Sequence, residues 1–190
     1  MLIYTTGENM IVIYDTETTG LLAPAANDIS KQPYIIEICA MKFTNDMELV
    51  DEYSSLIKPP IPISDEITKI TKISNDMLKD APSFADVYAD IANLFLGASA
   101  MVAHNLGFDR SMLANELVRI DRLIQFPWPM RHICTVERSM SYEGRRLNLT
   151  KLHKLATGKE QIDGAHRAKT DVLALVKCFE FLRKEGKIKL

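Results

Sequence analysis

The chain has 190 residues, of which 47% are hydrophobic and 25% charged, with a formal net charge of −2. These values predict one globular domain over residues 1–190, and they exclude a strongly basic nucleic-acid sleeve while allowing a local basic patch. The start of the chain lacks the pattern of a signal peptide, no apolar run reaches the ~20 residues of a membrane span, and the three cysteines show no disulfide or metal spacing, so we expect a cytoplasmic protein that does not contact a membrane.

The first half of the chain is predicted to begin with three strands. The segment "IVIYD" (11–15) is β-branched and apolar without alternation, which is typical of a central strand covered on both faces. Segments 34–43 and 48–57 are predicted as strands that form a hairpin across the polar turn "TND". A short helix is predicted at 64–74 and an amphipathic helix at 82–97, where Gly97 is a candidate C-cap.

The second half is predicted to alternate between strands and helices. A buried strand is expected at 100–104 and an amphipathic helix at 107–124. A short strand is expected at 131–136, a short helix at 148–157 and the last helix at 167–186. This order of elements predicts a mixed α/β sheet with flanking helices.

Two acidic residues lie at the end of the first predicted strand. Asp15 and Glu17 are two residues apart, so in an extended chain they share one face at a spacing of roughly 6.6 Å. Two like charges in this position repel each other, and a divalent cation bound by their oxygens would remove the repulsion. The alternative is a solvated turn, because Asp, Thr and Gly are common turn residues.

Acidic residues also border the apolar stripes of two predicted helices. Asp109 lies in the first turns of one helix, and Asp171 lies four residues before the core position Leu175 of the last helix. Each could instead be a first-turn acid stabilised by the helix dipole. His166 lies five residues before Asp171, on the loop that enters the helix, from where its imidazole can reach the same region. Four acids from three segments that converge on one point are typical of a two-metal phosphoryl-transfer site.

Three motifs in the sequence resemble those of a known enzyme family. "YDTETTGL", "VAHNLGFDRSML" and "GAHRAKTDVLAL" are similar, in this order, to the three motifs of the DnaQ-like DEDDh 3′–5′ exonucleases. "YIIEICAMKF" and "ITKITKISNDMLKDAPSF" resemble the family's second strand and the stretch before its second motif. The resemblance covers roughly residues 10–182.

The resemblance implies a ribonuclease H-like fold with a mixed five-stranded sheet and a 3′–5′ exonuclease activity that releases nucleoside 5′-monophosphates. It implies that two Mg²⁺ or Mn²⁺ ions are bound by four carboxylates and that His166 is the general base. The implied metal ligands are Asp15, Glu17, Asp109 and Asp171.

Five residues near the motifs are candidate substrate contacts. Thr18 and Leu21 resemble family positions near the terminal nucleotide, although Thr18 could serve only to shape the turn. His104 and Asn105 are candidates for positioning the substrate, with a helix cap as the alternative for Asn105. Phe108 is a candidate for stacking on a base, and helix packing is the alternative.

The segment 131–169 carries nine Lys or Arg residues against four Asp or Glu. Such a segment can follow nucleic-acid phosphates, or it can be an ordinary solvated surface. Trp128 is a candidate for base stacking, with a loop anchor as the alternative. The candidate phosphate contacts are Arg138, Arg145, Arg146, Lys151, Lys154 and Arg167.

The expected substrate is the 3′ end of single-stranded or frayed nucleic acid, with DNA favoured. The last helix lies close to Leu190, so we expect polymerase docking, if any, through the globular surface and not through a C-terminal tether. The loop 22–33 is expected to shape substrate choice or to be a solvated insertion. The sequence selects no oligomeric state.

Three other interpretations are open at this point. The chain could be an RNA 3′-exonuclease of the ribonuclease T or oligoribonuclease type. It could be an inactive exonuclease-like docking module, against which the complete acid set argues. A phosphotransfer receiver domain with Asp15 as the acceptor would need regular βα alternation, and the early hairpin argues against it.

Overall fold

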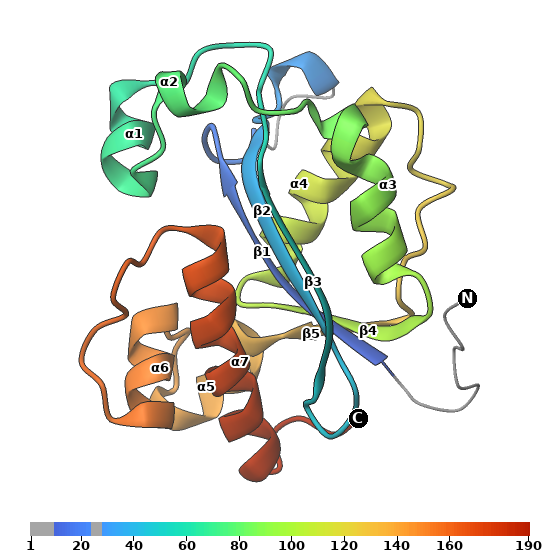
Figure 1. Ribbon diagram of the computed structural model, residues 1–190. Helices are drawn as coiled ribbons and strands as arrows, with labels where there is room; N and C mark the ends of the chain where they lie inside the picture. The colour runs from blue at the N-terminus through green and yellow to red at the C-terminus, as the bar shows by residue number, and fades with distance from the viewer. Residues whose placement is uncertain (1–9, 24–27) are drawn as a thin grey trace.

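The computed structural model describes residues 10–23 and 28–190, and the chain is built around one mixed sheet (Figure 1). Its strands run in the order β3-β2-β1-β4-β5. β1 is antiparallel to β2 and parallel to β4, β2 and β3 form the predicted hairpin, and β4 is parallel to β5. The predicted mixed sheet and the central place of its first strand are therefore confirmed. The strands are β1 (Met10–Thr18), β2 (Ile35–Phe43), β3 (Leu49–Leu56), β4 (Ala98–Ala103) and β5 (Arg131–Cys134).

Short helices and turns connect the strands, and one longer helix ends the chain. In chain order they are the 3₁₀ helix η1 (Ile29–Lys31), α1 (Asp65–Thr71), α2 (Asn75–Leu78), α3 (Phe84–Phe95), α4 (Leu106–Arg119), α5 (Thr135–Glu143), α6 (Leu149–Thr157) and α7 (Ala168–Lys184).

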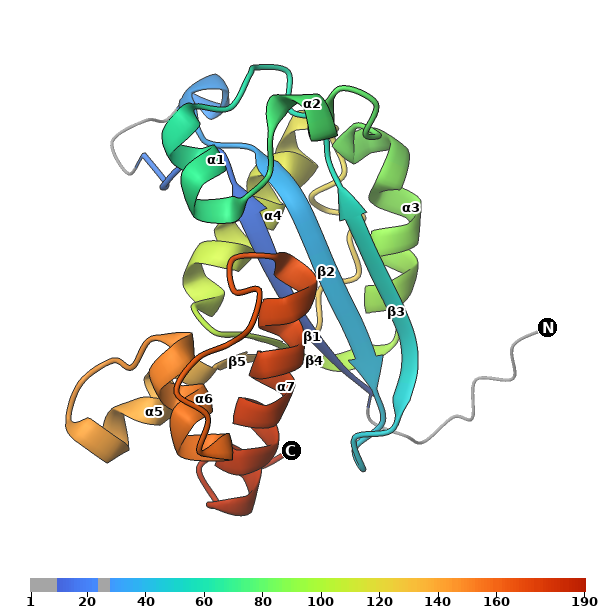
Figure 2. The ribbon, with the colours of Figure 1, turned by 60° about the vertical axis from the view of Figure 1, so that its left-hand side comes forward.

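Helices cover both faces of the sheet, as the two ribbon views show (Figures 1 and 2). Successive residues of a strand point to opposite faces. Val12 and Tyr14 of β1 accordingly pack among residues of α3 and α4. Ile11 and Ile13 pack on the other face among residues of α6 and α7. β1 is buried on both sides, which explains its unbroken run of apolar residues.

A third, smaller cluster holds α1 and α2 against the sheet. It contains Ile36 of β2, Ile63, Ile73 and Leu78.

The strand β2 also contains a bulge beside the end of β1. The pairing of β1 with β2 shifts register between Glu17 and Thr18, so Ile36 is an extra residue in β2 at this point. Bulges of this kind redirect side chains and are common beside active sites.

Several predicted boundaries were wrong. β1 continues beyond residue 15 to Thr18, so Glu17 lies within the strand. The helix expected at 64–74 is α1, which ends at Thr71 because Lys72 adopts a left-handed conformation with φ 61°. α2, which follows it at Asn75–Leu78, was not predicted. The helix expected at 107–124 ends at Arg119, two residues before Asp121, which has φ 54°.

Other differences concern α3 and the segment after β4. α3 ends at Phe95 with Leu96 as its C-cap, and the predicted capping glycine, Gly97, follows directly with φ 75°. The strand expected at 131–136 ends at Cys134, and α5 follows it without having been predicted. Within the predicted loop 22–33 the structure places η1, while residues 24–27 lie outside the described residues. Among the described helices, none is long and apolar enough to cross a membrane.

Candidate active site

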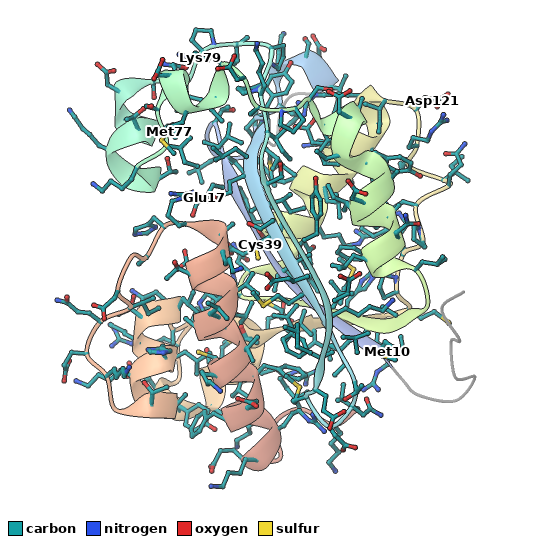
Figure 3. The ribbon with its side chains drawn as sticks, in the orientation of Figure 1. Met10, Glu17, Cys39, Met77, Lys79 and Asp121 are labelled. Atoms are coloured by element: carbon teal, nitrogen blue, oxygen red, sulfur yellow. The ribbon has the colours of Figure 1, made fainter. Side chains whose placement is uncertain are left out.

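Four carboxylates gather near the carboxyl end of β1. Asp15 and Glu17 alternate with buried residues of the strand and point to the face that α7 covers; Figure 3 labels Glu17 near this end of the strand. Asp109 lies in the first turn of α4 and Asp171 in the first turn of α7, with only 4% and 9% of their surfaces exposed. The structure thus brings together all four acids that the sequence analysis singled out.

Asp109 is fixed by its contact with the strand. Its Oδ1 accepts a hydrogen bond from the backbone N–H of Thr16 at 3.2 Å and another from the Thr16 hydroxyl at 2.8 Å. Thr16 lies between Asp15 and Glu17, so these bonds join α4 to the acidic end of β1. A buried carboxylate requires such partners.

Asp171 is joined in the same way to the loop that carries His166. Its Oδ2 accepts a hydrogen bond from the backbone N–H of His166 at 3.1 Å. The predicted position of His166 on the loop entering α7 is confirmed, and its side chain is exposed. Glu17, His166 and Asp171 each offer a ligand atom, and these atoms all lie within 4.8 Å of one another.

The electrostatics of the four acids favour a bound cation. Burial, followed by the charges of Asp109, Asp171 and Glu17, raises the pKa of Asp15 well above its ordinary value. Burial and neighbouring carboxylates raise the pKa of Glu17 to about 8, and burial raises that of Asp109 to about 7 against the lowering effect of its Thr16 hydrogen bonds. Burial also raises the pKa of Asp171. Clustered carboxylates with raised pKa values fit a divalent cation with oxygen ligands, which would neutralise them.

A fifth carboxylate at the site was missed by the sequence analysis. Glu37 of β2 is 4% exposed and lies directly opposite Glu17 in the β1–β2 pairing. It forms an ion pair of 2.7 Å with Arg167, which the sequence analysis had grouped with the candidate phosphate contacts. The available signal was a glutamate inside the otherwise apolar run "YIIEICAM".

The side chains of the candidate substrate contacts differ in their exposure and in the contacts that they make within the protein. The Thr18 hydroxyl donates to the Gly20 carbonyl at 2.8 Å, which is the turn-shaping alternative. Leu21 is 84% exposed. Asn105 is exposed and occupies the predicted N-cap position of α4, but its side chain makes no capping hydrogen bond. Phe108 is partly buried and packs against the core, as its packing alternative predicted.

His104 has a structural role that the sequence analysis did not predict. One ring nitrogen lies 3.0 Å from the Thr135 hydroxyl and the other 3.1 Å from the Leu147 carbonyl. Burial lowers the pKa of His104 to about 4. Both polar atoms of the ring are occupied by the protein, so we do not propose His104 as a substrate contact.

Several of the candidate phosphate contacts bind acidic side chains of the protein. Arg145 pairs with Glu143 and Lys154 with Glu160, and Arg167 is held by Glu37.

Trp128 serves as a loop anchor, since its ring packs on Phe126 with centroids 4.7 Å apart and its N–H donates to the Leu123 carbonyl. Arg138 lines a cavity of about 500 Å³ at the end of β5 together with Arg131, His132, Ile133, Gly186, Lys187, Ile188 and Lys189.

That cavity lies away from the acids. Arg131 pairs with Ala100, which in turn pairs with Ile11, four residues before Asp15. The basic side chains around it are therefore at the opposite end of the sheet from the carboxylate cluster.

Comparison with known proteins assigns this arrangement to a family. Residues 12–179 match the family model described as "Exonuclease". A DNA polymerase III PolC-type of Lacticaseibacillus paracasei is 32% identical over 179 residues, which cover 92% of this chain and 11% of that protein. The chain thus spans a small part of the length of this relative.

Solved structures share the fold. Exonuclease X, solved "in complex with 5′ overhanging duplex DNA", has a TM-score of 0.63 and 24% identity, with 93% of each chain covered. The nuclease domain of 3′hExo, "a DEDDh family member, bound to rAMP", has a TM-score of 0.71 and 17% identity, with 95% of this chain and 94% of that chain covered. The predicted ribonuclease H-like fold and the resemblance to DEDDh exonucleases are confirmed.

Proposed function

The chain belongs to the exonuclease family, and from this premise we propose that it is a 3′–5′ exonuclease that removes nucleotides from the 3′ ends of single-stranded or frayed DNA. The observation that carries the proposal is the convergence of Glu17, His166 and Asp171, whose ligand atoms lie within 4.8 Å of one another. Exonuclease chemistry needs acids and a base at one point, and these residues come from two separate segments of the chain.

We propose that the carboxylates of Asp15, Glu17, Asp109 and Asp171 hold two Mg²⁺ or Mn²⁺ ions. When bound, the ions would supply electrostatic stabilisation for the charge that develops on the phosphodiester. The raised pKa values of these buried acids support the proposal, because unpaired clustered carboxylates are unfavourable without a compensating cation.

His166 is proposed as the general base. Its exposed ring on the loop before α7 can accept the proton of an attacking water molecule. The water oxygen forms a bond to phosphorus, and the bond from phosphorus to the 3′ oxygen of the preceding nucleotide breaks. The terminal nucleotide then leaves as a nucleoside 5′-monophosphate. Asp171 would keep the base in place through its hydrogen bond from the His166 backbone N–H.

DNA is the proposed polymer because the similar curated protein is named as a DNA polymerase III. RNA is the competing substrate, since the similar nuclease domain of 3′hExo is bound to rAMP. We further propose that the chain works with a replicative DNA polymerase, through its globular surface. Gel filtration with a purified polymerase III catalytic subunit tests that association, and separate elution at micromolar concentrations would contradict it.

The activity test uses 5′-labelled single-stranded DNA and RNA of one sequence, with Mg²⁺, with Mn²⁺ or with EDTA. The wild-type chain is compared with Asp15→Asn and with the control Asp90→Asn, which changes an exposed acid of α3. A metal-dependent ladder that shortens from the 3′ end, lost in Asp15→Asn and kept in Asp90→Asn, is the expected result.

The two polymers separate the substrate classes. Faster digestion of DNA supports the proposal, and faster digestion of RNA by at least tenfold would replace it with the RNA exonuclease. A folded wild-type chain that digests neither polymer, with metal present, would contradict a catalytic role.

A further inference from the structure

Glu37 and Glu17 form an unfavourable pair of neighbours in the sheet. They are directly opposite each other on the antiparallel strands β2 and β1. Like charges in this relation destabilise a sheet, and Glu37 is almost completely buried. Glu37 is also among the charges that raise the pKa of Asp15, Glu17 and Asp171. A sheet that holds both glutamates therefore needs a counter-charge beside them.

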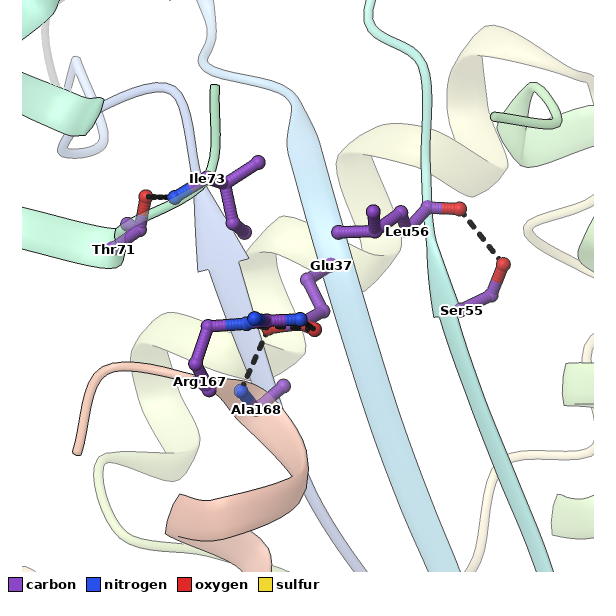
Figure 4. A network of polar contacts seen from close by, with 7 residues as sticks. All are labelled: Glu37, Ser55, Leu56, Thr71, Ile73, Arg167 and Ala168. Carbon is purple, nitrogen blue, oxygen red and sulfur yellow. Dashed lines mark hydrogen bonds and ion pairs between the residues drawn. The ribbon is translucent and has the colours of Figure 1, made fainter. Parts of the chain in front are cut away.

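Arg167 supplies that charge to Glu37 (Figure 4). Its Nε lies 3.1 Å from each carboxylate oxygen of Glu37, and its Nη2 lies 2.7 Å from Oε1. The backbone N–H of Ala168, the first residue of α7, donates to Glu37 Oε2 at 2.9 Å. Glu37 is thus neutralised and fully hydrogen-bonded, while Glu17 is left to bind other ligands.

The same contacts hold the loop that carries His166. His166 has φ 66°, in the left-handed region that residues other than glycine rarely adopt, so the surrounding structure must hold its backbone there. On one side its N–H donates to Asp171. On the other side the next two residues, Arg167 and Ala168, are both bound to Glu37.

We propose that Glu37 and Arg167 are positioning residues that hold His166 beside Glu17 and Asp171. Arg167 acts by fixing the backbone of the loop, and Glu37 acts by anchoring Arg167 and the start of α7 on β2. The inference rests on the proposed role of His166 as the general base. The Arg167 side chain is 38% exposed, and a partly exposed ion pair adds little stability by itself. We therefore assign the role of this pair to the backbone that it orients.

The alternative role of Arg167 is direct contact with a substrate phosphate. Its Nε and Nη2 both bind Glu37, so a phosphate contact would have to compete with the pair or use the remaining nitrogen. The two roles predict different kinetics: a positioning residue changes kcat, whereas a phosphate contact changes KM and its dependence on salt.

The kinetic test compares Arg167→Gln and Arg167→Lys with the wild type on single-stranded DNA. We expect both variants to lower kcat roughly 10- to 100-fold with KM changed by about twofold or less. Lysine keeps the charge but cannot form the planar two-point contact, so its failure to restore kcat supports positioning. The matched control is Lys169→Gln, because Lys169 also lies in the first turn of α7. The substitution breaks only an exposed ion pair with Glu52 of β3, so it should leave kcat unchanged.

A His166→Ala background makes the test specific. If Arg167 acts through His166, Arg167→Gln costs nothing further in a chain that lacks the imidazole. A full additional loss of kcat in this background would overturn the inference. So would a higher KM with unchanged kcat, which indicates phosphate contact, or a lower melting temperature with unchanged kcat, which indicates a structural role.

A second readout does not depend on activity. The chain has four histidines, so ¹⁵N-histidine labelling gives a simple spectrum in which His166 is assigned by its loss in His166→Ala. In Arg167→Lys and in Glu37→Gln we expect the His166 ring signals to shift or broaden and those of His104 to stay in place. Unchanged His166 signals in both variants would overturn the inference.

These outcomes are distinct from a failure of the proposed function. If the wild type digests neither DNA nor RNA, the proposed function fails, and with it this inference. If the wild type is active and the Arg167 variants keep its kcat, only the inference fails.

Discussion

Asp109 on α4 accepts two hydrogen bonds from a single residue of β1, Thr16, one from its backbone N–H at 3.2 Å and one from its hydroxyl at 2.8 Å. Thr16 is 7% exposed and is not one of the predicted metal ligands. Its position between Asp15 and Glu17 means that one side chain joins the second motif to the first.

Replacing Thr16 by valine should loosen this junction. Thr16→Val keeps the shape and the backbone bond but removes a buried hydrogen bond to a carboxylate, which contributes about 1.5–3 kcal/mol when the acid is ionised. The hydroxyl bond also lowers the pKa of Asp109, so the variant should hold its proton to higher pH and bind Mn²⁺ roughly tenfold more weakly. Urea denaturation at pH 8 and calorimetric Mn²⁺ titration measure the two effects.

Thr16→Ser is the matched control, because serine keeps the hydroxyl. We expect it to stay close to the wild type in Mn²⁺ affinity. Equal affinities of the valine and serine variants would mean that the hydroxyl does not orient Asp109.

The raised pKa of Glu17 makes a prediction about the metal-free protein. Its ordinary value is 4.5 and its value in the fold is about 8, so between these limits the folded state binds more protons than the unfolded state. The contribution of Glu17 to the free energy of unfolding therefore falls as the pH rises from about 4.5 to about 8. Glu17→Gln removes the titrating carboxyl group. In EDTA, the free energy of unfolding of this variant should therefore fall less than that of the wild type over the same pH interval.

Urea denaturation at pH 5, 6.5 and 8 in EDTA measures the difference between the two chains. Saturating Mn²⁺ should restore the wild type at pH 8 and have a smaller effect on Glu17→Gln, because bound metal stabilises only the form that binds it. Parallel pH curves for the two chains in EDTA would be inconsistent with a raised pKa at Glu17.

Much of the fold could be predicted because its local signals agree with its packing. The unbroken apolar run of β1 indicated a strand buried on both faces, which its two layers of helices confirm. α5 was missed because its sequence "TVERSMSYE" contains few apolar residues, and only Thr135, Val136 and Ser139 of it are buried. The end of α1 was missed because Lys72 adopts a left-handed conformation that glycine usually signals.

The carboxylate cluster could be predicted from spacing, whereas its supporting contacts could not. Arg167 lies in a basic segment, and its partner Glu37 is 130 residues earlier in the sequence, so no local pattern links them. His104 was named as a candidate for positioning the substrate because it is a polar residue within the second motif. Its actual partners, Thr135 and Leu147, come from later segments that pack against it only in the folded chain.

The structural role of His104 leads to a third prediction. His104→Ala leaves the buried Thr135 hydroxyl and the Leu147 carbonyl without their partner and should lower the free energy of unfolding by about 1–3 kcal/mol. At a temperature where the variant is folded, its KM for single-stranded DNA should equal that of the wild type. Thermal denaturation and initial rates of digestion measure both.

The adjacent Asn105→Ala is the control for this prediction. Asn105 is exposed and makes no capping bond, so its loss should change stability by less than about 0.5 kcal/mol and raise KM if the side chain contacts substrate. A higher KM in His104→Ala, without loss of stability, would return His104 to the substrate contacts.

Leu21 is a candidate substrate contact that can be tested without disturbing the fold. Its side chain is 84% exposed, just beyond the end of β1, so Leu21→Ala should change the free energy of unfolding by less than about 0.5 kcal/mol. If the terminal nucleotide packs on this leucine, the truncation should cost about 1–2 kcal/mol of binding, which is a KM roughly 5- to 30-fold higher. The control is Leu96→Ala, which truncates another exposed leucine beside the start of β4, at the other end of the sheet. A KM that rises in Leu21→Ala and stays unchanged in Leu96→Ala supports contact between Leu21 and the substrate, because a general loss of surface hydrophobicity would affect both variants. Equal KM values for the two variants and the wild type would exclude this contact.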